Sequence, residues 1–139
     1  MNEAPYRWFD HTADVGMEVW GESLPRLFAH AALGLYDLMG APASLERRVE
    51  EEIRLEGADL GDLLVAWLGE LAYRLAVHGH VYGAPEPVVE GTTLRARLVG
   101  GVVSEGVRRM AREVKAATYH DLVVRRTPAG WEARVIFDI

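Results

Sequence analysis

Two stripes of apolar residues at helical spacing constrain the fold of this chain most, because each stripe must be buried against another layer. The first follows Ser23, a residue suited to cap a helix N-terminus, and stops at Gly40. The second follows Asp59, which forms a capping arrangement with Asp62, and stops at Gly79. The apolar positions are Leu24, Leu27, Phe28, Ala31, Leu35 and Leu38 in the first helix and Leu60, Leu63, Leu64, Trp67, Leu68, Leu71 and Leu75 in the second.

Alternating apolar and polar residues, the pattern of half-buried strands, flank and separate these helices. The expected strands are Tyr6–Asp10, Val15–Trp20, Val49–Leu55, Val81–Tyr82, Pro87–Glu90, Leu94–Val99, Lys115–Arg126 and Trp131–Phe137. The last two form an antiparallel hairpin around a turn at Thr127–Gly130, and Ser104–Arg112 forms a short helix. Because βαβ alternation is absent, we predict one α+β domain over residues 1–139. In it, a mostly antiparallel sheet packs against two main helices plus one short helix.

Several classes of protein are excluded by composition. The chain has no cysteine, which rules out disulfide scaffolds, zinc ribbons and thiol nucleophiles. No apolar run approaches the ~18 residues of a membrane span. The first residues lack a basic region followed by an apolar run, so no secretory signal is expected. We therefore expect a cytoplasmic protein with no membrane partner.

Charge is unevenly distributed along the chain. The formal net charge is −6, which argues against a freestanding nucleic-acid-binding protein. Residues 1–70 carry 14 acidic and five basic side chains, whereas residues 71–139 carry seven and ten. Such a molecule could present one face to a basic protein and another to a phosphate-bearing partner.

Histidines and carboxylates are the remaining candidates for chemistry, because the sequence has neither a Walker loop nor a GxGxxG motif. His11 and His120 each adjoin a polar cluster, although histidines in connecting segments are commonly hydrogen-bonding turn residues. His30 lies beside the apolar stripe of the first helix and is expected to be packed or half-exposed, not functional. A helix end followed by the start of a strand explains His78 and His80 better than a metal site does.

The C-terminus carries two adjacent anions. Asp138 ends an apolar strand, and the α-carboxylate of Ile139 follows it directly. Their repulsion is costly unless a cation binds them. With Asp14 from the first loop, they could form an oxygen-only site suited to Ca²⁺, Mg²⁺ or Mn²⁺ rather than zinc. From the pattern alone, a polar strand end without an ion is the favoured reading.

Five blocks of the sequence together resemble the archease family. They are Phe9–Gly16, which contains His-Thr-Ala-Asp, and then Leu27–Leu35, Asp62–Leu68, Glu113–His120 and Trp131–Ile139. They occur in the family's order and span nearly the whole chain.

The resemblance implies an accessory protein, not an enzyme. Archeases assist the RtcB-type RNA ligase in tRNA splicing and RNA repair, promoting guanylylation of the ligase histidine and multiple turnover. An accessory protein of this kind would contact RNA only indirectly, through the ligase. The resemblance also implies a divalent metal, calcium first and magnesium or manganese otherwise, held by Asp14, Asp138 and the backbone carboxylate of Ile139. The chain departs from the family around Val102–Arg109, where the family is more acidic and aromatic.

Two other classes of function remain open. An autonomous metallohydrolase would use the carboxylates with His11 or His120 and would turn over a phosphoester alone. A general chaperone or interaction module with an incidental ion would bind many unfolded clients. It would be indifferent to the substitution Asp14→Ala.

Overall fold

The computed structural model describes residues 4–11, 14–41, 47–83, 85–105 and 114–139. Its elements in chain order are β1 (Tyr6–His11), β2 (Asp14–Gly21), α1 (Leu24–Met39), β3 (Arg47–Glu56), α2 (Leu60–His78), β4 (His80–Tyr82), β5 (Val88–Glu90), β6 (Thr93–Val102), β7 (Ala116–Thr127) and β8 (Gly130–Asp138). Among the described helices, none is both long and apolar enough to cross a membrane.

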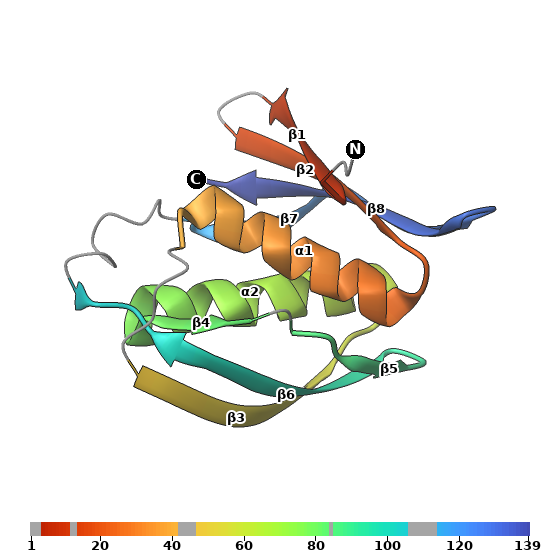
Figure 1. Cartoon of the computed structure of the whole chain (residues 1–139). Helices are drawn as coiled ribbons and strands as arrows, with labels where there is room; N and C mark the ends of the chain where they lie inside the picture. Colours follow the sequence, from red (N-terminus) through yellow and green to blue (C-terminus); the bar gives the residue numbers. More distant parts are fainter. Residues whose placement is uncertain (1–3, 12–13, 42–46, 84, 106–113) are drawn as a thin grey trace.

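The strands form two antiparallel sheets, with both helices in the layer between them (Figure 1). One sheet has the order β1-β2-β8-β7, and the other has the order β3-β6-β4, with β5 also pairing with β6. The α+β class with antiparallel strands around two main helices is therefore confirmed. Division into two sheets follows from helices that bury broad apolar surfaces and so need cover on both sides. The short helix predicted over Ser104–Arg112 falls largely on residues 106–113, outside the described part of the chain.

Local side-chain chemistry begins and ends the helices where the sequence predicts. The hydroxyl of Ser23 accepts a hydrogen bond from the backbone N–H three residues later, at 3.3 Å. Asp59 accepts one from the N–H of Asp62, at 2.8 Å. Gly40 and Gly79 each end a helix in the left-handed region, with φ of 71°, which favours glycine.

The core is one cluster that joins the helices to both sheets. Trp67 of α2 is fully buried, and its indole N–H donates to the carbonyl of Phe28 in α1, at 2.9 Å. Phe137 from β8 and Leu98 from β6 reach this cluster from opposite sheets and are also fully buried. The described residues include no buried charged or polar side chain.

The sheet β1-β2-β8-β7 has two different faces. Its inner face packs on the helices through residues such as Met17 and Val19. Its outer face lies on the side away from both helices (Figure 1). This outer face carries Asp14, Gly16, Glu18 and Trp20 of β2 opposite Asp138, Ile136, Arg134 and Glu132 of β8. Glycine at position 16 leaves room for the ring of Phe9, which lies over it and would have to move to admit a Cβ.

Candidate metal centre

Asp14 and Asp138 are direct cross-strand partners at one end of the outer face. Asp14 is the first residue of β2 and Asp138 the last residue of β8, and the register of the antiparallel pair places them opposite each other. Directly opposite residues share a face, with Cβ atoms about 4.5–5.5 Å apart. Asp14 is half-buried and Asp138 is exposed. The fold thus brings together two carboxylates that are 124 positions apart in sequence.

Two contacts hold the main chain at the end of β8, next to the two carboxylates. The backbone N–H of Lys115 donates to the carbonyl of Asp138, at 2.8 Å. Ile139 follows, and its half-buried side chain packs against the core. These contacts fix the backbone from which the carboxylate of Ile139 extends. Sequence reasoning did not place Lys115 here, although it is the chain's single lysine.

The donor set suits a hard divalent cation. Two carboxylates and a main-chain carboxylate offer only oxygen atoms, the ligands that Ca²⁺, Mg²⁺ and Mn²⁺ prefer. Like charges directly opposite each other destabilise a sheet, and a bound cation would offset that cost. Across the residues that the structure describes, no three His, Cys, Asp or Glu side chains gather to hold a metal. The third ligand of the predicted set is the main-chain carboxylate of Ile139 and not a side chain.

The two candidate histidines lie at different places. His11 ends β1 and is the register partner of Asp14, in the same row as Asp138. His120 lies in the part of β7 where pairing with β8 is interrupted, between Thr118 and Val123. Its Nε2 is 3.4 Å from the carboxylate of Asp121. His120 is therefore off the row that contains the two carboxylates.

The interruption in β7 carries a contact that the sequence did not reveal. The hydroxyl of Tyr119 donates to the carboxylate of Asp62 at the start of α2, at 2.5 Å. This bond lowers the pKa of the Asp62 carboxyl and raises the pKa of the Tyr119 hydroxyl. Asp121, two residues later, adopts a positive φ of 51°. The signal missed is length: β7 has 12 residues against nine in its partner β8, and extra residues in one strand of an antiparallel pair form a bulge.

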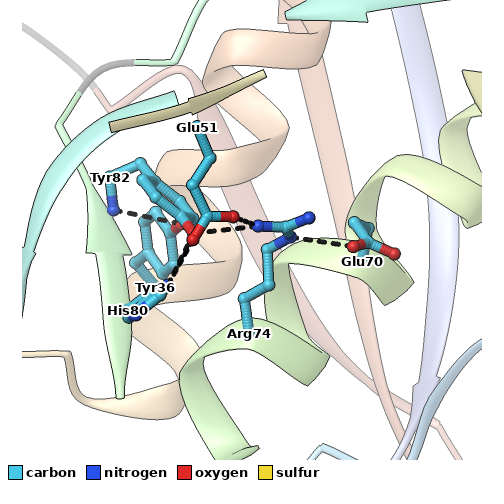
Figure 2. A network of polar contacts seen from close by, with 6 residues as sticks. All are labelled: Tyr36, Glu51, Glu70, Arg74, His80 and Tyr82. Carbon is cyan, nitrogen blue, oxygen red and sulfur yellow. Dashed lines mark hydrogen bonds and ion pairs between the residues drawn. The ribbon is translucent and has the colours of Figure 1, made fainter. Parts of the chain in front are cut away.

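A second polar cluster lies between α2 and the sheet β3-β6-β4. Figure 2 shows the guanidinium of Arg74 between the carboxylates of Glu51 and Glu70. The Nδ1 of His80 is 2.9 Å from the hydroxyl of Tyr82 and 3.4 Å from Glu51. Because Arg74 engages both carboxylates, this cluster joins strands to a helix and offers little to a metal. The prediction that a helix end explains His78 and His80 agrees with the left-handed cap at Gly79.

Tyr36 gives this cluster a measurable role in stability. Its hydroxyl accepts a hydrogen bond from the backbone N–H of Tyr82 at 3.3 Å, and burial raises its pKa. We expect Tyr36→Phe to lower the free energy of unfolding by about 1–3 kcal/mol, since a buried donor loses its partner. Urea denaturation measures the change. Tyr73→Phe, at a residue that is 54% exposed, should change stability far less, and equal losses would contradict this role.

Comparison with known proteins places these features in a family. A family model described as "Archease protein family (MTH1598/TM1083)" matches residues 6–139. The archease of Pyrococcus furiosus is 35% identical over 136 residues, which cover 94% of this chain and 96% of that protein. The archease of Archaeoglobus fulgidus is 35% identical over 137 residues, covering 96% and 98%.

Solved structures agree with this match. The solution structure of Methanobacterium thermoautotrophicum protein 1598 superposes with a TM-score of 0.76 at 27% identity, covering 99% of this chain and all of that one. A Thermotoga maritima crystal structure, described as an archease and possible chaperone, superposes with a TM-score of 0.66. Its identity is 22%, with 94% of each chain covered, so it supports the fold alone.

Proposed function

The chain belongs to the archease family, and we propose that it is an accessory factor of an RtcB-type RNA ligase in the cytoplasm. In this proposal it promotes guanylylation of the ligase histidine and multiple turnover, in tRNA splicing and RNA repair. It meets RNA only through the ligase. The observation that carries the proposal is the pairing of Asp14 with Asp138 at the end of two neighbouring strands.

We propose that Asp14, Asp138 and the carboxylate of Ile139 hold a divalent ion, calcium first and magnesium or manganese otherwise. When bound near a nucleoside triphosphate, such an ion neutralises charge that builds on phosphate oxygens as the ligase histidine attacks. The chain's own contribution is positional. The β2–β8 ladder sets the spacing of Asp14 and Asp138, and the bond from Lys115 fixes the backbone before Ile139.

Two features of charge suit docking to a ligase. The acidic residues concentrated in the first half of the chain can meet a basic cleft that normally binds RNA. Lys115 is exposed and adjoins Asp138 through its backbone, so we propose that its ammonium group binds a phosphate oxygen near this end of the sheet. Docking of this kind predicts that the effect weakens as salt rises.

We expect the purified protein to hydrolyse neither nucleotides nor RNA, and to accelerate transfer of GMP from GTP to the histidine of a cognate ligase. The acceleration should saturate with its concentration and decline with salt. Labelled GMP on the ligase measures the first effect, and released phosphate measures hydrolysis. Substoichiometric protein should suffice when ligase is in excess, because each molecule can act repeatedly.

The rival hydrolase makes the opposite prediction. It needs a histidine near the carboxylates. His11 shares their row as the register partner of Asp14, whereas His120 lies off that row and contacts Asp121. Robust turnover by the protein alone, abolished by His11→Ala or His120→Ala, would favour that enzyme. Activation of the ligase that survives both substitutions would favour the accessory role.

A further inference from the structure

The outer face is hollowed at the end away from Asp14 and Asp138. A cavity of about 350 Å³ is lined there by residues that include Glu18, Trp20, Val123, Arg125, Glu132 and Arg134. Trp20 lies six residues along β2 from Asp14, which is ~20 Å at the rise of an antiparallel strand. The cavity is therefore separate from the proposed metal centre, although both open on one face of one sheet.

Strand register places complementary groups in two rows across this cavity. In one row, Trp20 of β2 is opposite Glu132 of β8, which is opposite Arg125 of β7. In the next row, Glu18 is opposite Arg134. Directly opposite residues share a face, so these side chains stand side by side. Trp20 is 41% exposed, which is unusual for so large an apolar ring and leaves an indole surface open to a ligand.

Glu132 retains hydrogen-bonding capacity. Its Oε1 accepts from the Nε of Arg125, whereas its Oε2 accepts no hydrogen bond from the residues that the structure describes. A carboxylate oriented by one arginine and with a second oxygen available can accept two parallel N–H groups from a flat ligand. The carboxylate of Glu18 is bound by Arg7 at 2.5 Å and lies 3.7 Å from Arg134, so it is less available.

We propose that this cavity binds the guanine base of a mononucleotide. The edge of guanine presents two adjacent donors, N1–H and the N2 amino group, which match the carboxylate of Glu132. Its O6 and N7 atoms accept from an arginine, a pairing that the terminal N–H groups of Arg125 can supply, whereas the guanidinium of Arg134 already lies over the ring of Phe9. The indole of Trp20 provides a stacking surface for the ring.

The same hydrogen-bonding groups distinguish guanine from adenine, the other purine base. Adenine carries an unprotonated N1 and an amino group at C6, so a carboxylate opposite its edge meets a lone pair instead of a donor. The lining also opposes a polyanion, because Glu18 and Glu132 offset the charges of Arg125 and Arg134. A neutral flat base fits this balance better than a run of phosphates does.

Calorimetric titration of the isolated full-length protein with GMP and with AMP tests the inference. We expect GMP to bind roughly tenfold more tightly than AMP, within the range that one good bidentate pair provides. Glu132→Gln should bring the two affinities to within about threefold, because an amide can accept from only one of the donors. Trp20→Ala should weaken GMP binding by about tenfold through lost stacking.

Two matched control variants test whether a loss of GMP binding is specific to this cavity. Glu52→Gln makes the same change on an exposed residue of β3, and Tyr73→Ala removes an exposed ring from α2. Both should bind GMP like the parent. Equal affinity for GMP and AMP in the parent, or discrimination that survives Glu132→Gln, would overturn the inference. Because the titration contains no ligase, its result is independent of the proposed accessory role.

Discussion

Replacing Asp14 by asparagine should abolish stabilisation of the protein by calcium or manganese. An ion that binds only the folded state at 100 times its dissociation constant adds about 2.7 kcal/mol to the free energy of unfolding. Asparagine keeps the shape of the side chain and removes the anionic oxygen that faces Asp138 across the strands. Thermal unfolding with the ion and with chelator measures the difference.

A neighbouring carboxylate supplies the matched control. Asp10 is exposed on β1 and pairs with Val15, one register position from the row that contains Asp14. Neighbouring strand positions point to opposite faces, so Asp10→Asn makes the same charge change on the other side of the sheet. It should keep the ion-induced shift in full. In chelator both variants should unfold within roughly 1 kcal/mol of the parent. An equal shift in parent and Asp14→Asn would remove Asp14 from the ligand set.

A C-terminal extension should reduce ion binding about as strongly as the Asp14→Asn substitution does. A hexahistidine tag placed after Ile139 converts the α-carboxylate into a peptide bond and fills the space beside Asp138. We therefore expect the tagged protein to lose ion binding and ligase activation while its unfolding in chelator is unchanged. The same tag before Met1 should be harmless. Calorimetric metal titration and a guanylylation assay compare the two forms.

Smaller changes at the terminus isolate the group responsible. Ile139→Val should be mild, because only the main-chain carboxylate is asked to bind the ion. Amidation removes the charge alone and should act like the tag. Deleting Ile139 moves the carboxylate back by ~3.3 Å and onto the other face of the strand. If both tagged forms bind the ion equally, the terminal carboxylate takes no part.

The helices were predictable because their boundaries depend on local chemistry. Ser23 and Asp59 each cap a helix through their own side chains, and Gly40 and Gly79 each end one in the left-handed region. None of these interactions requires knowledge of the rest of the fold. The α+β class follows from the helices together with the period-two segments between them.

Arrangements that depend on distant partners were harder to predict. Nothing local shows that β3 and β6 belong to a different sheet from β2 and β8, because both sets alternate in the same way. The bulge in β7 places Tyr119 against Asp62, a contact between residues 57 positions apart. The bulge itself depends on how the longer strand β7 pairs with the shorter strand β8.

The proposed metal site was predictable in composition but not in geometry. Charge and family resemblance both pointed to Asp14 and Asp138. Their usefulness depends on strand register, since a slip of one residue would turn one carboxylate to the opposite face. The observed register instead makes them direct partners. The role of Lys115 depends on the same ladder, through its backbone bond to Asp138.

Guanylylation of a cognate ligase by GTP, with limiting accessory protein and saturating divalent ion, tests the central claim most directly. The parent and Asp10→Asn should both accelerate transfer of GMP to the ligase histidine. Asp14→Asn should leave the rate at that of the ligase alone, although it folds normally. Acceleration by Asp14→Asn equal to that of the parent would contradict the claim that a carboxylate-bound ion on this face activates the ligase.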